Sequence, residues 1–393
     1  MDVNIYKKLL LRIVYALAIM LLVVNCGQKK TDELTEDDKV DWGFHTVEKV
    51  DSLNPILKPS VDFSFESPIS NKTVYWESRN VLNPAAVVHN ETVYLFYRSQ
   101  DSSGTSRIGL ATSTDGLHFD KRSKPVLYPD EDPMMRYEWH YKKLANDTLD
   151  TDCKNCLFDG IEDPRIVGSP DGNYVMTYTA YDGKTARLSV ATSSNLLHWT
   201  KQGLAFEDKK YRDVWSKSGA IVAELQGEKV IAKKINGSYW MYFGDTDIFL
   251  AKSDDLIHWE ICENEESKNP ISVLYPRPGY FDSRLVEPGP FALYTAKGIL
   301  LIYNGSNAAN FNDTELPKFT YAAGQALFDK EAPYILLDRT SDYFIYPDKP
   351  YEKIGEVNLV CFVEGLVPYS NRWFLYYGTA DSKIAVATTV LDE

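Results

Sequence analysis

Five short apolar segments, each rich in aromatic residues, recur along the chain and are typical of β-strands. Each is followed by a short polar gap and then by a second apolar segment. They cover residues 93–97, 174–178, 239–243, 299–303 and 373–377. No long segment shows the period of 3.6 residues that indicates an amphipathic helix, so the chain is predicted to be all-β.

A second pattern recurs after these strands. Its clear copies are Ala-Thr-Ser-Thr-Asp-Gly-Leu-His-Phe at 111–119, Ala-Thr-Ser-Ser-Asn-Leu-Leu-His-Trp at 191–199 and Ala-Lys-Ser-Asp-Asp-Leu-Ile-His-Trp at 251–259. Degenerate copies lie at 324–330 and 385–391. A unit of strand, turn and strand that is repeated five times predicts a five-bladed β-propeller. A two-sheet sandwich is the alternative, but it would not explain the recurring element.

The polar residue in the middle of each clear copy is expected to cap a turn. It is Asp115, Asn195 and Asp255 in turn, and an asparagine at one copy favours a hydrogen-bonding role over an ionised one. The histidine of each copy is expected to be structural as well. The six histidines show no spacing typical of a metal site, and no glycine-rich phosphate loop precedes a helix, so neither a metal nor another cofactor is predicted.

The N-terminus has the pattern of an export signal. Three basic residues precede an almost entirely apolar run in residues 1–25, and Cys26 follows this run as it does in a bacterial lipobox. A short membrane anchor is the alternative. We expect that Cys26 is lipidated, that residues 26–45 form a flexible tether, and that 46–393 form a single catalytic domain. The protein would then be extracytoplasmic and attached to the membrane only through its lipid, on the periplasmic face of the outer membrane or on the cell surface.

Charge and cysteine content narrow the possible partners and chemistry. The formal net charge is −14, which argues against nucleic acid as a partner, and no feature indicates an oligomeric state. Cys153 and Cys156 form a C-x-x-C pair without a second such pair or nearby histidines. In an oxidising compartment a local disulfide or two unpaired thiols are expected there, rather than a zinc or redox site.

Two acids and an arginine cluster in the segment Gly-Ile-Glu-Asp-Pro-Arg-Ile at 160–166. Near the centre of a propeller, Asp163 beside Arg165 is a candidate proton donor or ligand clamp. A structural ion pair at a strand end is the alternative, since such pairs are common.

The wider context of this segment resembles glycoside hydrolase family 130. Glu-Asp-Pro-Arg at 162–165 lies between Asn-Pro-Ala-Ala-Val at 83–87 and Tyr-Gly-Thr-Ala-Asp at 377–381, and the resemblance covers about residues 75 to 391. It implies an inverting enzyme that acts on β-mannosides, either a phosphorylase or a β-1,2-mannosidase. By this resemblance Asp163 is the general acid, and the residues expected to hold the non-reducing mannose are Asn83, Arg98, Arg107 and Asp381.

The group that attacks the sugar distinguishes the two activities. Phosphate would need a cationic pocket, for which the resemblance leaves Arg187 and Lys217, whereas an aromatic run that ends in Asp245 replaces a basic pair expected on the third blade. Water would need a base, for which Glu287 and Asp245 are candidates. The sequence therefore favours an exo-β-1,2-mannosidase that acts on mannan or glycan oligosaccharides. The alternatives are a β-mannoside phosphorylase and a sugar-binding lipoprotein without activity.

Overall fold

The computed structural model describes residues 40–45, 47–140, 142–143 and 156–390. In these ranges nearly all regular structure is β-strand, and the helices α2 (Met135–Glu138) and α4 (Pro350–Lys353) have one turn each. The prediction of an all-β chain is confirmed. None of the helices in the described ranges is long and apolar enough to span a membrane.

Most strands fall into five successive antiparallel groups. The first contains β4 (Asn80–His89), β5 (Thr92–Gln100), β6 (Thr105–Ser113) and β7 (Asp120–Lys121). The second contains β8 (Asp159–Gly168), β9 (Tyr174–Tyr181), β10 (Ala186–Ser193) and β11 (Thr200–Leu204). The third is built on β12 (Ala220–Gln226), β15 (Ser238–Phe243), β16 (Ile248–Ser253) and β17 (Glu260–Ile261), with β13 (Lys229–Ala232), β14 (Lys234–Ile235) and β18 (Ser272–Leu274) beside them.

The last two groups complete the chain. The fourth contains β19 (Leu285–Pro288), β20 (Ala292–Tyr294), β21 (Ile299–Ser306), β22 (Tyr321–Phe328) and β23 (Leu336–Arg339). The fifth contains β24 (Cys361–Tyr369), β25 (Arg372–Thr379), β26 (Lys383–Thr389) and β1 (Glu48–Lys49). A separate hairpin pairs β2 (Phe65–Ser67) with β3 (Lys72–Val74).

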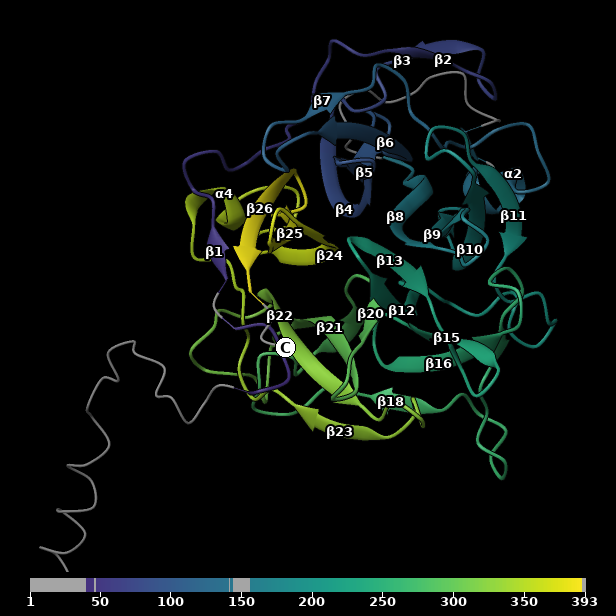
Figure 1. Ribbon diagram of the computed structural model, residues 1–393. Coiled ribbons are helices and arrows are strands. Elements are labelled where there is room, and N and C mark those ends of the chain that lie inside the picture. Colours follow the sequence, from purple (N-terminus) through teal and green to yellow (C-terminus); the bar gives the residue numbers. More distant parts are fainter. Residues whose placement is uncertain (1–39, 46, 141, 144–155, 391–393) are drawn as a thin grey trace, which may run out of the picture. The chain divides into compact units, whose positions relative to one another are not determined.

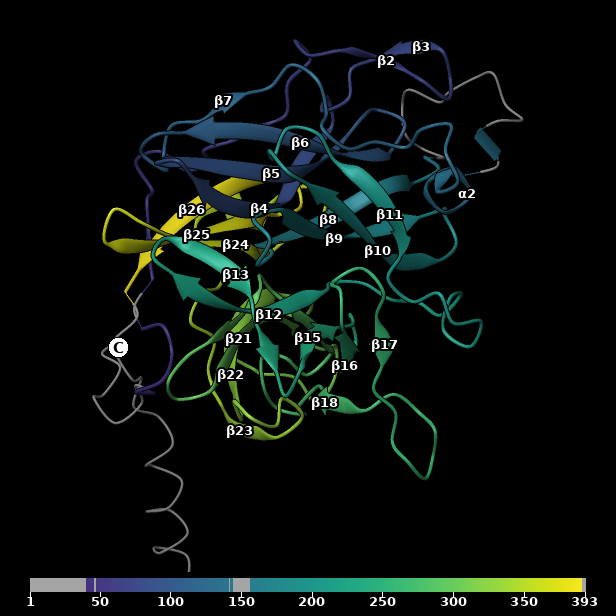
Figure 2. The same ribbon diagram turned by 45° about the vertical axis from the view of Figure 1, so that its right-hand side comes forward.

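The five groups lie around a common centre (Figure 1). The first strands of three groups, β4, β8 and β24, contact one another there and remain adjacent in both views (Figures 1 and 2). Parallel pairings link neighbouring groups: β6 with β8, and β12 with β20. Side chains at the start of these inner strands can therefore converge although they are far apart in sequence.

The predicted strands and turns are found where the sequence placed them. All five apolar segments lie within strands, namely β5, β9, β15, β21 and β25. Asp115 Oδ1 accepts hydrogen bonds of 2.8 Å from the backbone N–H groups of Leu117 and His118, and Asn195 and Asp255 make the equivalent pair in their own turns. The repeated element is a set of structural turns, as predicted.

The packed domain begins before residue 46. Trp42 and Phe44 are buried, and the Trp42 indole donates a 2.9 Å hydrogen bond to Asp338. The Phe44 N–H donates to the Gln325 side chain at 2.8 Å. Both rings remove apolar surface from water, so residues 41–44 belong to the folded unit and not to the predicted tether. Cys26 and residues 1–39 lie outside the described residues.

The cysteines in the described ranges differ in state. Cys156 is disulfide-bonded, whereas Cys262 and Cys361 are free. Cys153 lies outside the described residues, so its pairing with Cys156 stays a prediction. Cys361 is fully buried and Cys262 partly so, in keeping with the small apolar role that free cysteines often have.

Candidate active site

Irregularities in three inner strands bring polar side chains to the centre. The pairing register shifts between Leu82 and Pro84 in β4, and between Glu162 and Arg165 in β8. A third shift, in β24, surrounds Glu364. A β-bulge adds a residue to one strand and redirects its side chains, and bulges are frequent next to active sites.

Asn83 and Asp163 occupy the bulges of β4 and β8 in the left-handed region, with φ values of 47° and 50°. Asparagine and aspartate tolerate this conformation better than other residues that carry a Cβ. Asn83 Nδ2 donates a 2.8 Å hydrogen bond to Asp163 Oδ1, so the two bulges are joined directly. Gly378 lies against this pair, and a Cβ at that position would come within 2.8 Å of Asn83 Oδ1.

Two cations complete the surroundings of Asp163, which is only 2% exposed. Arg98 Nη1 donates to Asp163 Oδ1 at 3.2 Å, and Lys217 Nζ lies 3.4 Å from Oδ2. Burial opposes ionisation of this carboxyl, but Arg98, Lys217 and the Asn83 hydrogen bond outweigh it and lower its pKa. Asp163 is therefore ionised in the unliganded protein.

Glu162 is a site residue that the sequence did not single out. Its carboxylate accepts a 2.7 Å hydrogen bond from Arg98 Nη2, and it is 5% exposed. Successive residues of a regular strand point to opposite faces, which would have separated Glu162 from Asp163. The bulge between Glu162 and Arg165 removes that constraint, so one arginine binds both acids.

Arg165 connects the strands that carry the site. Its Nε donates to the carbonyl oxygen of Gly289 at 2.6 Å and its Nη2 to that of Pro288 at 2.7 Å. The same Nη2 lies 2.7 Å from Glu364 Oε1 and forms an ion pair with it, but the angles of this contact are not those of a hydrogen bond. Arg165 therefore fixes β8 against the end of β19 and against β24.

Glu287 lies on β19, immediately before Pro288, and is 6% exposed. Burial raises its pKa to about 7, partly offset by the charge of Lys217. The Ser218 hydroxyl donates a hydrogen bond to Glu287 Oε1, from a residue held at a φ of 57°. Lys217 is thus adjacent to Asp163 and interacts with Glu287 as well; these acids hold the pKa of its amine above the usual value although burial opposes this.

Asp381 and Glu364 add two further carboxyls to the centre. Burial raises the pKa of Asp381 to about 6, although Arg98 opposes the rise. Burial also holds the pKa of Glu364 well above its usual value, against the attraction of Arg165. Asp381, like Asn83 and Asp163, has a positive φ. A concentration of buried titratable groups with shifted pKa values is typical of an active site.

Three predicted site residues have other partners in the structure. Arg107 is fully buried, donates a 2.7 Å hydrogen bond to Asp101 and does not join the ion pairs around Asp163. Arg187 binds Asp182 at 2.8 Å and, through Nη2, Asp213 at 3.1 Å. Asp245 accepts a 2.6 Å hydrogen bond from the Trp215 indole. The structure therefore brings together Asn83, Arg98, Asp163, Lys217 and Glu287, with Asp381 in electrostatic contact.

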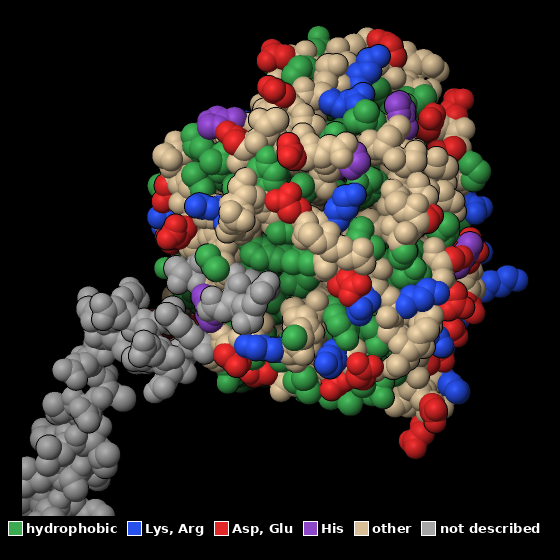
Figure 3. Space-filling model, in the orientation of Figure 1, with side chains coloured by type: hydrophobic (Ala, Val, Ile, Leu, Met, Phe, Trp, Pro, Cys, Tyr) green, Lys and Arg blue, Asp and Glu red, His purple; other side chains and the backbone are tan. Residues whose placement is uncertain are grey.

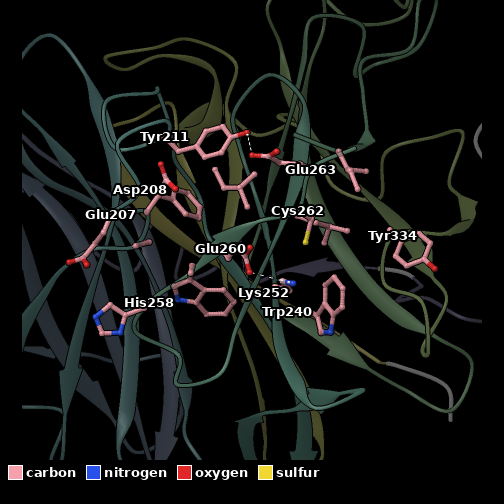
Figure 4. Close-up of a pocket in the computed structure, with 16 residues that line it drawn as sticks. Glu207, Asp208, Tyr211, Trp240, Lys252, His258, Glu260, Cys262, Glu263 and Tyr334 are labelled. Atoms are coloured by element: carbon pink, nitrogen blue, oxygen red, sulfur yellow. Dashed lines mark hydrogen bonds and ion pairs between the residues drawn. The ribbon is translucent and has the colours of Figure 1, made fainter. Parts of the chain in front are cut away.

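A cavity of about 650 Å³ lies elsewhere, between the segment that follows β11 and the strands β16 and β17, and none of the predicted site residues lines it (Figure 4). Two pairs of polar side chains in its lining interact, Tyr211 with Glu263 at 2.8 Å and Lys252 with Glu260 at 3.4 Å. In the described ranges no group of three or more His, Cys, Asp or Glu residues is arranged to hold a metal ion. On the face drawn in Figure 3, the described Lys and Arg side chains are interspersed with Asp and Glu.

Comparison with known proteins identifies the family. The model of glycoside hydrolase family 130, described as β-1,4-mannooligosaccharide phosphorylase, matches residues 47–393. The chain therefore belongs to glycoside hydrolase family 130, and the prediction of this family is confirmed. It is an enzyme of the class that breaks glycosidic bonds.

The relatives in this family include both phosphorylases and hydrolases. A 1,2-β-oligomannan phosphorylase of Thermoanaerobacter sp. (strain X514) is 30% identical over 79% of this chain and 90% of its own length. A solved structure described as showing that the family contains glycoside hydrolases that target β-1,2 mannosidic linkages in Candida mannan is 40% identical. It covers 91% of this chain and 96% of that chain, with a TM-score of 0.83. A glycosyl hydrolase from Bacteroides ovatus is 41% identical, over 92% and 96%, with the same TM-score.

Proposed function

We propose that this protein is an inverting exo-β-1,2-mannosidase that uses water, not phosphate, to release mannose from mannan or glycan oligosaccharides. One observation carries the choice of water: each cation that could hold phosphate is already neutralised by carboxylates. Arg187 binds Asp182 and Asp213, and Lys217 lies between Asp163 and Glu287. A phosphate dianion would have to displace these acids or bind beside them.

Lys201 supports the same conclusion. By the family resemblance it stands where phosphorylases carry an arginine for phosphate. Its amine here lies 2.9 Å from Asp132 Oδ2 and also forms an ion pair with Glu138. Glu138 is fully buried, and Tyr178 donates a further 3.0 Å hydrogen bond to it. Lys201 is thus part of a structural network rather than a free anion-binding group.

The relatives support the linkage and the sugar. The Thermoanaerobacter protein acts on β-1,2-linked oligomannan, and the relative that is 40% identical belongs to a group described as targeting β-1,2 mannosidic linkages. Of these two relatives, the one described as targeting β-1,2 mannosidic linkages is the more similar to this chain in sequence. We therefore assign this chain to β-1,2-mannosides and to hydrolysis.

In the proposed mechanism the two carboxyls on different strands divide the acid and base roles. Asp163 delivers a proton to the glycosidic oxygen and Glu287 removes one from the attacking water. Asp163 and Glu287 together hold one proton. In the unliganded protein this proton is on Glu287, because the pKa of Glu287 is raised and that of Asp163 is lowered. In the form that reacts, the same proton is on Asp163 and Glu287 is ionised. The two carboxyls therefore titrate as a coupled pair.

The arrangement of the strands indicates where the sugar binds. We infer that the five antiparallel groups are the five blades of a β-propeller and that its centre holds the mannose at Asn83, Arg98 and Asp381. The arrangement of the groups around one centre supports this, as does the convergence of β4, β8 and β24 (Figure 1). The blades of a propeller surround a central channel, which is where β4, β8 and β24 would meet.

The N-terminal pattern also indicates where the enzyme is located. We propose that Cys26 is lipidated after removal of residues 1–25 and that the enzyme is anchored outside the cytoplasm, as predicted from the sequence. An extracytoplasmic site also suits hydrolysis, because a sugar phosphate released outside the cell membrane would be lost to the cell.

The proposal is tested by the phosphate dependence of the rate. A protein that starts at Asp41 is incubated with β-1,2-mannobiose at several phosphate concentrations, and mannose and mannose 1-phosphate are both measured. We expect mannose to form at a rate that is independent of phosphate. Mannose 1-phosphate that forms in proportion to phosphate would overturn the assignment to hydrolysis, and the absence of both products would overturn the assignment to β-1,2-mannosides.

A further inference from the structure

An exposed tryptophan borders the site on the segment between β11 and β12. Trp215 is 48% exposed, which is unusual for so large an apolar side chain. Its indole N–H donates a 2.6 Å hydrogen bond to Asp245 Oδ2. Its ring lies edge-on to Tyr181, with 6.2 Å between the ring centroids and an angle of 70°. The indole is therefore fixed at its polar edge and along one side, while much of its surface remains open.

The segment that carries Trp215 is fixed at a second point. Arg187 Nη2 lies 3.1 Å from Asp213 Oδ1, and Arg187 Nη1 lies 2.8 Å from Asp182. Arg187 extends from β10, whereas Asp213 is two residues before Trp215. Two residues that the family resemblance assigned to the reaction, Arg187 and Asp245, thus hold one segment in place.

This segment lies next to the catalytic carboxyls. Lys217, two residues after Trp215, is 3.4 Å from Asp163. The backbone N–H of Gly244, next to Asp245, donates a 2.9 Å hydrogen bond to the carbonyl oxygen of Lys217, and the charge of Asp245 contributes to the raised pKa of Glu287. Trp215 is therefore an exposed residue connected to the site through its sequence neighbour Lys217 and its partner Asp245.

We propose that the open surface of the Trp215 indole is the platform on which the leaving-group sugar stacks, and that Asp245 is a positioning residue for this platform. The inference rests on the proposed function, because it requires a glycosidic substrate. A pyranose ring presents apolar C–H groups on its faces, and a rigid aromatic ring covers them with little loss of side-chain entropy. The open edge of an exo-acting site is where the leaving sugar must lie.

The contact to Trp215 also limits what Asp245 can do. A general base needs a free carboxylate oxygen directed at the attacking water. Each acid has one oxygen in a hydrogen bond, Asp245 with the Trp215 indole and Glu287 with the Ser218 hydroxyl, but only Glu287 is buried at the centre, beside Lys217. Glu287 is therefore the base, and Asp245 acts through Trp215.

Kinetics on two substrates distinguish an effect on sugar stacking from an effect on the chemical step. The leaving group of β-1,2-mannobiose is a sugar, whereas that of β-mannosyl fluoride is fluoride ion, so only the disaccharide can use the platform. We expect Trp215→Ala to lower kcat/KM for mannobiose relative to that for the fluoride by roughly tenfold or more, mainly through KM. Tyr334→Ala is the matched control, because Tyr334 is a 54% exposed tyrosine in the separate cavity of Figure 4. We expect the ratio of the two kcat/KM values to be unchanged in this control.

Variants of Asp245 test its role independently. Asparagine keeps an acceptor for the indole N–H, whereas alanine does not, so Asp245→Ala should shift the substrate ratio as Trp215→Ala does and Asp245→Asn should restore most of it. Equal loss on both substrates in Asp245→Asn would identify Asp245 as a base and overturn the inference. An unchanged ratio in Trp215→Ala would overturn the stacking alone. A wild-type protein that cleaves neither substrate would overturn the proposed function and this inference with it.

Discussion

Asn83 Nδ2 donates a 2.8 Å hydrogen bond to Asp163 Oδ1, and this contact joins bulges in two different strands. Both residues adopt a positive φ, a conformation that costs on the order of 1 kcal/mol or more for a residue with a Cβ. The cost is offset by packing of the surrounding strands, which are buried along most of their length. The carboxyl that we assign as the acid is therefore held in place before substrate arrives.

Replacement of Asp163 tests its role as the acid. Asp163→Asn should lower kcat by about 10²- to 10⁴-fold, because the amide cannot deliver the proton. The Asn83 contact can still form, since the new side chain retains an acceptor oxygen, so sugar binding should change little. Isothermal titration with mannobiose and a kcat measurement check both expectations. A variant with near wild-type kcat would contradict the assignment.

The pH dependence of kcat/KM follows from the shared proton of Asp163 and Glu287. Above about pH 7 Glu287 loses the proton of the pair, and no proton is then left for Asp163. We expect kcat/KM to fall as pH rises through this region. The fall at low pH should come below the usual pKa of an aspartate, because the pKa of Asp163 is lowered. Initial rates between pH 4 and 9 should show the fall at high pH and no fall down to pH 4, and a rate that increases from pH 7 to 9 would contradict this pairing.

Glu287 also makes stability depend on pH. Its pKa is about 7 in the folded protein, against 4.5 for the ordinary group. Between these values the folded state keeps a proton that the unfolded state has lost, so this contribution to the free energy of unfolding falls as pH rises from 4.5 to 7. Glu287→Gln has no such charge to bury and can still accept from Ser218.

We therefore expect the free energy of unfolding of Glu287→Gln, relative to wild type, to rise by on the order of 2 kcal/mol between pH 4.5 and pH 8. Denaturant unfolding at the two pH values measures the change. The same variant should be severely impaired in hydrolysis. A difference between variant and wild type that does not depend on pH would show that Glu287 is not buried as a titrating acid.

Arg165 should affect the rate by positioning the two carboxyls. Arg165→Lys keeps the positive charge near Glu364 but cannot bind the carbonyl oxygens of Pro288 and Gly289 together. We expect kcat to fall roughly tenfold or more with a small change in KM. A thermal melt establishes that the variant is folded. A folded variant with unchanged kcat would show that Arg165 does not position the acid and the base.

Much of the fold could be predicted from the sequence. The apolar segments and the repeated turns each have local causes, so the strands and the structural role of Asp115 followed from their own residues. The family resemblance placed Asp163, Asn83 and Glu287 in the site. Trp42 and Phe44 were missed because a few apolar residues at the end of a polar segment give no periodic signal.

The partners of the site residues could not be predicted in the same way. Glu162 was missed because a regular strand would have turned it away from Asp163, and the bulge that reverses this has no clear sequence pattern. Trp215 was missed because its significance depends on a contact across 30 residues, with Asp245. Contacts between separate segments decide which of the candidate charges are paired, and no spacing along the chain encodes them.

The first product in phosphate buffer tests the central claim most directly. Cleavage of β-1,2-mannobiose can be followed by ¹H NMR from the first turnovers, before the anomers of mannose equilibrate. An inverting hydrolase built on Asp163 and Glu287 should release α-mannose first, with no phosphorylated sugar. α-Mannose 1-phosphate as the first product would contradict the account and would mean that phosphate displaces the acids now paired with Arg187 and Lys217.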